Sequence, residues 1–253
     1  MSNRLTVLRA LSVLGAAGGV ALAGCSSATT AAGGVSATTT GAGPTGALLR
    51  QAAAKTAAAS GARVSGHATL AGATGAGSAA ALHVSDSGVV SFPRRAAAMT
   101  VIVRGGPVLH VRLIGASVYE RESGQSRWSR VSQASQARSV ATTMLTPGDP
   151  ATVMDYLRFP ATSVTRVGTQ TVGGVPTTEY TATLHPSIET SKLGMPLHVW
   201  IDRQGRVRQV TIAVLTQVTA SPGAAATRSV DSMNLTVDFS DFGIRPVISA
   251  PAN

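Results

Sequence analysis

Residues 164–184 read VTRVGTQTVGGVPTTEYTATL, and this stretch decides the fold. Gly173 and Gly174 form a two-residue link of the kind that closes a β-hairpin, because both central positions of a type I′ turn need positive φ angles. On the returning arm, residues 180–184 (YTATL) alternate between apolar side chains and threonine. A period of two is typical of a strand with one buried face, so the stretch predicts an antiparallel hairpin.

The same period of two continues on both sides of this hairpin. In residues 109–113 (LHVRL) every second position is apolar, and His110 and Arg112 lie between the apolar positions. Turn sequences such as Ser123-Gly124 separate the runs. The pattern predicts strands at 64–70, 88–92, 99–103, 108–114, 117–120, 128–131, 164–172, 175–184, 197–201, 206–217 and 233–239.

Two helices are predicted among these strands. Residues 46–60 (GALLRQAAAKTAAAS) are mostly strong helix formers without an internal Pro, and Gly61 favours an end there. A second helix is predicted over 149–158, because Asp149 suits an N-cap and Pro150 suits the first helical position. The order of helix, strands, helix and strands, without βαβ alternation, indicates an α+β domain with an antiparallel sheet.

The first 25 residues have the features of a bacterial export signal. Arg4 and Arg9 precede an uncharged, largely apolar run at 10–23, which is too short to span ~30 Å of hydrocarbon as a helix. The run ends in a sequence that resembles the lipobox of signal peptidase II substrates, made of Leu22, Ala23, Gly24 and Cys25. This resemblance implies cleavage before Cys25 and a diacylglyceryl-type lipid, carrying fatty acids such as palmitate, on its thiol. The alternative is an ordinary secreted protein with an incidental cysteine.

Composition divides the chain into three segments. Residues 26–45 (SSATTAAGGVSATTTGAGPT) have no charge and no apolar period, so they cannot bury enough surface to fold. We therefore predict a signal peptide at 1–24, the lipidated cysteine and a flexible tether at 25–45, and a single domain at 46–253. Cys25 is the only cysteine of the chain, which excludes an intramolecular disulfide.

The formal charge of the chain is +10, from 21 basic and 11 acidic residues. The basic residues are scattered, apart from Arg94-Arg95 and the group Arg203, Arg206 and Arg208. We interpret them as solvated faces of strands and loops, in preference to a specific anionic site. Export and the lack of a basic run interleaved with aromatic residues argue against nucleic acid as a partner.

The sequence offers little for catalysis. None of its five histidines has the spacing of a metal ligand pair, and no G-x-S-x-G elbow presents a nucleophile. The sequence alone leaves open a Ser-His-acid triad, because its members need not be close along the chain. We predict that the protein is not an enzyme and that it uses no metal or other cofactor.

A series of short motifs resembles a known family. Residues 172–180 (VGGVPTTEY) match the hairpin motif of the LppX/LprG group of actinobacterial lipoproteins, which is related in fold to the LolA lipoprotein carriers. The resemblance covers about 48–251, and its other motifs are at 64–68 (VSGHA), 118–119 (VY), 128–130 (WSR), 167–168 (VG), 196–202 (PLHVWID), 205–207 (GRV) and 237–243 (VDFSDFG).

This resemblance implies a curved antiparallel half-barrel with helices on its concave face and an apolar cavity between them. It implies an envelope lipoprotein that binds or carries acylated lipid or glycolipid without covalent catalysis. Val153, Met154 and Leu157 share one helix face and are the candidate lining of the cavity. A filled core requires the same face, so a sensor or scaffold on this fold, with an exported protein partner, is the alternative. Either protein is expected at the cell membrane, lipid-anchored on its extracytoplasmic face.

Overall fold

The computed structural model describes residues 44–71, 81–131, 150–185, 194–218 and 229–252. These residues belong to one compact unit, Ala42–Asn253. Its two helices are α1 (Pro44–Ala57) and α4 (Pro150–Tyr156). The strands are β1 (Ala62–Ala71), β2 (Leu82–Ser91), β3 (Ala96–Val103), β4 (Val108–Ile114), β5 (Ser117–Glu122), β6 (Ser129–Val131), β7 (Ala161–Val172), β8 (Val175–Leu184), β9 (Met195–Asp202), β10 (Val207–Val218) and β11 (Ser229–Ser240).

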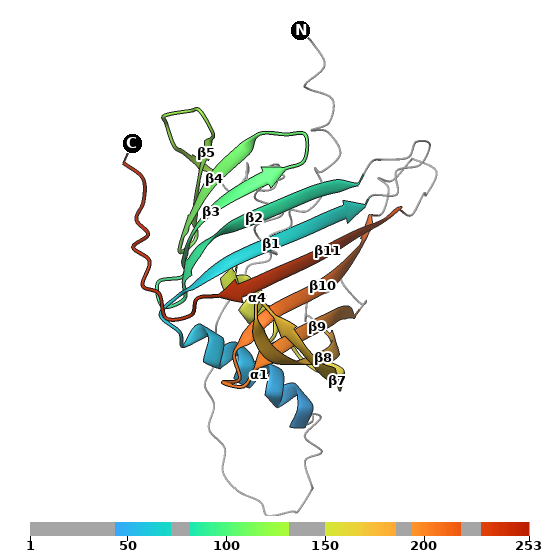
Figure 1. Cartoon of the computed structure of the whole chain (residues 1–253). Helices are drawn as coiled ribbons and strands as arrows, with labels where there is room; N and C mark the ends of the chain where they lie inside the picture. Colours follow the sequence, from blue (N-terminus) through green and yellow to red (C-terminus); the bar gives the residue numbers. More distant parts are fainter. Residues whose placement is uncertain (1–43, 72–80, 132–149, 186–193, 219–228, 253) are drawn as a thin grey trace, which may run out of the picture. The chain divides into compact units, whose positions relative to one another are not determined.

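All eleven strands belong to one curved antiparallel sheet (Figure 1). The order is β6-β5-β4-β3-β2-β1-β11-β10-β9-β8-β7, so each half is a meander of sequential neighbours. The two meanders join in the middle, where β1 pairs with β11 and Val64 lies opposite Phe239. The predicted α+β class with an antiparallel sheet is confirmed.

The antiparallel hairpin predicted over residues 164–184 is also confirmed. Its arms are β7 and β8, and Val172 pairs with Val175 across the turn. Gly173 and Gly174 have φ angles of 55° and 78°, which a side chain would strain and glycine adopts freely. The turn chemistry therefore fixes the position of the hairpin and its register from Val172 to Gly168. Farther from the turn, the register shifts between Arg166 and Gly168 and between Thr162 and Thr165.

Several boundaries differ from the prediction, and two of these differences have a clear physical reason. Strand β2 begins at Leu82, six residues before the predicted start, because Asp86 occupies an inward position and breaks the apolar alternation. Helix α1 ends at Ala57, before the predicted end at Gly61. A Cβ on Gly61 would lie 2.4 Å from the carbonyl oxygen of Val90, so this glycine serves close backbone packing and not the helix end.

The two helices contact each other, and α1 also contacts β7 and β10. The side chain of Thr56 is fully buried where the end of α1 meets the sheet. Its hydroxyl donates to the carbonyl of Ala52 and accepts from the backbone N–H of Val207, each at 2.8 Å. This pair of hydrogen bonds ties α1 to the start of β10. That the helices cover the concave face of the sheet stays a prediction.

Candidate functional site

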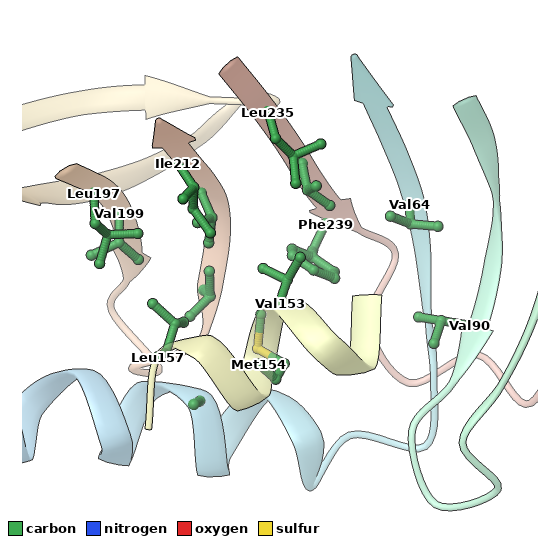
Figure 2. Packing of buried hydrophobic residues seen from close by; sticks show 14 of the residues in the cluster. Val64, Val90, Val153, Met154, Leu157, Leu197, Val199, Ile212, Leu235 and Phe239 are labelled. Atoms are coloured by element: carbon green, nitrogen blue, oxygen red, sulfur yellow. The ribbon is translucent and has the colours of Figure 1, made fainter. Parts of the chain in front are cut away.

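The candidate site is the apolar helix–sheet interface between α4, α1 and the central strands. Val153, Met154 and Leu157 of α4 have exposed fractions of 0%, 2% and 0%, so all three residues predicted from the sequence are buried. Figure 2 shows Val153 on the side of α4 that faces the strands and Met154 on the side toward α1. The other members labelled there are Val64, Val90, Leu197, Val199, Ile212, Leu235 and Phe239.

The register of the strands places apolar side chains of the sheet side by side in this interface. Ile212 of β10 pairs with Leu197 on one side and with Leu235 on the other, which gives a row of three apolar side chains across β9, β10 and β11. All three are at most 2% exposed. Alternate residues of the same strands point away from this row. The interface is thus assembled from the period-two pattern together with cross-strand pairing.

The side chains at this interface are apolar on both the helix side and the sheet side. Its helix side consists of the three α4 residues with Leu49 and Ala53 of α1. Such surfaces hold apolar groups by removing them from water, at ~25 cal/mol per Å². The structure brings the three predicted lining residues together, and their role as the wall of a ligand cavity stays a prediction.

A buried ionic cluster fixes the β9–β10 turn beside the interface. The carboxylate of Asp202 is fully buried and accepts from the guanidinium groups of Arg206, at 3.1 Å, and Arg208, at 2.8 Å. Both guanidinium groups also lie over the ring of Phe242, within 4.8 Å of its centre. Burial alone would raise the pKa of Asp202, and the bonds from the Arg206 backbone and the two side chains outweigh it and lower that pKa.

Asp86 is a residue that the sequence reasoning missed. It lies on β2 between Gly66 of β1 and Val101 of β3, and a Cβ on Gly66 would come 2.9 Å from both carboxylate oxygens. The carboxyl group thus shares the inward face with the buried Val84 and Val90, and burial raises its pKa to about 6. The signal in the sequence was Gly66, which leaves the room that this carboxyl group occupies.

The remaining predicted site residues are not described by the structure. Cys25 and its lipobox neighbours Leu22, Ala23 and Gly24 lie outside the described residues, and so does the predicted N-cap Asp149. In the described segments, no helix has the length and hydropathy needed to cross a bilayer. Nor do three or more His, Cys, Asp or Glu side chains of these segments gather where they could hold a metal ion.

Comparisons with known proteins give matches among solved structures alone, at low sequence identity. No family model matches the chain, and no curated protein matches its sequence. Among solved structures, the lipoprotein LppX of Mycobacterium tuberculosis is 16% identical with a TM-score of 0.49, over 81% of this chain and 98% of LppX. LprF of Mycobacterium bovis is 12% identical with a TM-score of 0.47, over 84% of this chain and 100% of LprF.

A third similar structure is a LolA superfamily protein of Nitrosomonas europaea. It is 11% identical with a TM-score of 0.27, over 79% of this chain and 93% of that protein. At such identities a likeness concerns the fold and not the activity. The described residues form a curved antiparallel sheet with two helices. LppX, whose group the sequence motifs resemble, is among the solved structures to which the chain is similar.

Proposed function

We propose that this protein is an envelope lipoprotein that binds the acyl chains of a lipid or glycolipid between α4 and the sheet, without covalent chemistry. The observation that carries the proposal is the apolar helix–sheet interface itself. Helix α4 contributes three buried apolar side chains, and three strands contribute a row of apolar side chains, to one core cluster. Each methylene of an acyl chain placed there gains ~0.8 kcal/mol from leaving water.

The properties of α4 suit a guest of variable length. The helix has seven residues, and isolated helices of fewer than ~12 residues are marginal in water, so packing holds it in place. An acyl chain that replaces the contacts of Leu157 leaves α4 with an equally apolar neighbour. Met154 adapts to such a change, because its thioether and three rotatable bonds follow irregular shapes.

The lipid on Cys25 places this binding domain at a membrane. Two or more acyl chains on one residue hold a protein stably, whereas a single chain binds marginally. Cys25→Ser is expected to move the protein from the detergent phase to the aqueous phase in a phase-partitioning experiment. Partitioning of the unchanged protein into the aqueous phase would contradict the anchor and leave an ordinary secreted protein.

The lipid ligand is tested on the domain from Gly46 onward, purified without detergent from its own host. Solvent extraction and native mass spectrometry are expected to find a bound acylated lipid. Leu157→Trp fills the space for the guest, so most of the lipid is lost while unfolding free energy changes by less than ~1 kcal/mol. The matched control is Val247→Trp, at a residue that is 86% exposed, and it is expected to retain the lipid.

One observation favours the alternative of a sensor or scaffold with an exported protein partner. Val153 and Leu157 are both 0% exposed, as they would be in a filled core. In a filled core, Leu157→Trp overpacks the interface and costs typically ~1–3 kcal/mol. A protein without extractable lipid, combined with that destabilisation, would refute the carrier proposal and support the scaffold.

A further inference from the structure

A pocket lined with basic side chains opens on the face of the sheet that points away from the apolar helix–sheet interface. Its volume is about 250 Å³. The share of one water molecule in the liquid is about 30 Å³, so the pocket has room for a polyatomic ligand. The side chains that carry the argument are Ser87, Thr100, His110, Arg112, Arg121 and Trp128. We call this hollow the arginine pocket.

The strand register builds the arginine pocket from short and long side chains. Thr100 of β3 pairs with Ser87 of β2 on one side and with His110 of β4 on the other. His110 in turn pairs with Arg121 of β5. In the next row, Arg112 lies beside Ala98. Short side chains on β2 and β3 therefore form a floor beside the long ones on β4 and β5.

Two arginine side chains contact the same tryptophan ring in this pocket. The guanidinium carbons of Arg112 and Arg121 lie 4.9 Å and 5.1 Å from the centre of the Trp128 ring. The two guanidinium carbons are therefore at most about 10 Å apart, a distance at which two like charges still repel each other. Among the residues that the structure describes, no carboxylate lines the pocket and neither arginine forms an ion pair.

The two arginines of the pocket differ in their hydrogen bonds. The Nε atom of Arg121 is buried and has no hydrogen-bond partner within the described part of the chain. A buried donor without a partner destabilises a fold, and more so when the group is charged. Arg112 is held in place by a 3.0 Å bond from its guanidinium to the carbonyl oxygen of Ser249. The pocket is therefore positive, with one arginine held in place and the other left with an unused donor.

We propose that the arginine pocket binds a phosphate group. Guanidinium groups bind phosphate oxygens through pairs of charge-assisted hydrogen bonds. The guanidinium groups of Arg112 and Arg121 line one hollow. The hydroxyls of Ser87 and Thr100 line it too, and the Thr100 hydroxyl also lies 3.4 Å from His110 Nδ1. A carboxylate offers two oxygens in one plane, whereas a phosphate offers three or more around a tetrahedron. Inorganic phosphate and the phosphate of an anionic lipid headgroup share this chemistry.

The test is a calorimetric titration of the full chain carrying Cys25→Ser, which lacks the expected anchor, with sodium phosphate at fixed ionic strength. Arg121→Lys keeps the charge and removes the Nε–H donor, so it is expected to weaken binding at least tenfold. The matched control is Arg94→Lys, the same change at an exposed turn residue, with an expected effect below twofold. Circular dichroism of each variant verifies that the fold is kept.

A second arm separates the two sources of phosphate. The same proteins are sedimented with vesicles of phosphatidylglycerol and, for comparison, of phosphatidylcholine. Saturable binding of inorganic phosphate that depends on Arg121 supports a free anion as sufficient ligand. Retention by phosphatidylglycerol alone, lost in Arg121→Lys, supports the headgroup as the source. Binding to neither, or equal losses in Arg94→Lys and Arg121→Lys, would overturn the proposal.

Discussion

The two faces of the sheet are made by the same strands, yet they differ in what defines them. On β4, Val111 is buried at 1% exposure, while its neighbours His110 and Arg112 line the arginine pocket. On the buried apolar face, any apolar side chain of suitable size could pack, because the hydrophobic effect has no preferred direction. The second face depends on which polar groups the register places side by side. The apolar face is therefore defined by burial, and the face with the arginine pocket is defined by cross-strand pairing.

The largest expected difference between the faces is in stability. Leu235→Ala removes a side chain that is 2% exposed from the row across β9, β10 and β11, which is expected to cost about 3 kcal/mol. Asn234→Ala, one residue earlier and exposed on the other face, is expected to cost below ~0.5 kcal/mol. Urea denaturation of both variants measures the difference. Equal costs would mean that the two faces are packed alike.

The next effect comes from the ionic cluster at the β9–β10 turn. Asp202→Asn leaves Arg206 and Arg208 without their carboxylate and is expected to cost about 2–3 kcal/mol at pH 7. Because the pKa of Asp202 is lowered in the folded state, its stabilisation is present above the unfolded pKa of ~3.9 and is lost as the pH falls further. Urea denaturation at pH 7 and pH 3 should therefore show a smaller variant effect at pH 3. A cost that stays constant between these pH values would contradict the charge argument.

A smaller effect of opposite sign is expected at Asp86, the carboxyl group on the apolar side. Its pKa is raised to about 6, so the folded state binds the proton more tightly than the unfolded chain. Stability therefore decreases as the pH rises from about 4 to about 6, and the full penalty remains at pH 7. Asp86→Asn is expected to stabilise the protein by ~1–2 kcal/mol at pH 7 and to flatten this part of the pH profile.

The control for this prediction is Glu122→Gln, which neutralises an exposed carboxylate at the end of β5. It should change unfolding free energy by less than ~0.5 kcal/mol at both pH 4 and pH 7. If Asp86→Asn instead lowers the unfolding free energy at pH 7, the carboxylate has a favourable partner and its inward position does not destabilise the fold.

Most of the strands could be predicted from the sequence, because alternation and glycine turns are local. The bounds of β4 and β8 match the predicted 108–114 and 175–184. The first half of β2 was missed, since Asp86 stands where the pattern requires an apolar residue. Val153, Met154 and Leu157 of α4 were predicted to share one apolar face. All three are buried, with Val153 toward the strands and Met154 toward α1.

The arginine pocket could not be predicted in the same way. Its two arginines lie nine positions apart, on β4 and β5, and the prediction treated them among scattered, solvated charges. They converge because His110 pairs with Arg121 and Trp128 lies against both guanidinium groups. Register and ring placement depend on three-dimensional packing, which the period of a strand does not contain.

The pairing of β1 with β11 has a consequence for how the domain is made. Each meander can form from segments that are neighbours along the chain, but the pairing between the meanders joins the first strand to the last. One edge of β1 therefore stays unpaired until β11 forms and Phe239 lies opposite Val64. Long-range pairing of this kind slows folding and leaves an exposed strand edge that invites aggregation. The protein is thus most prone to aggregation in the interval after β1 has formed and before β11 pairs with it.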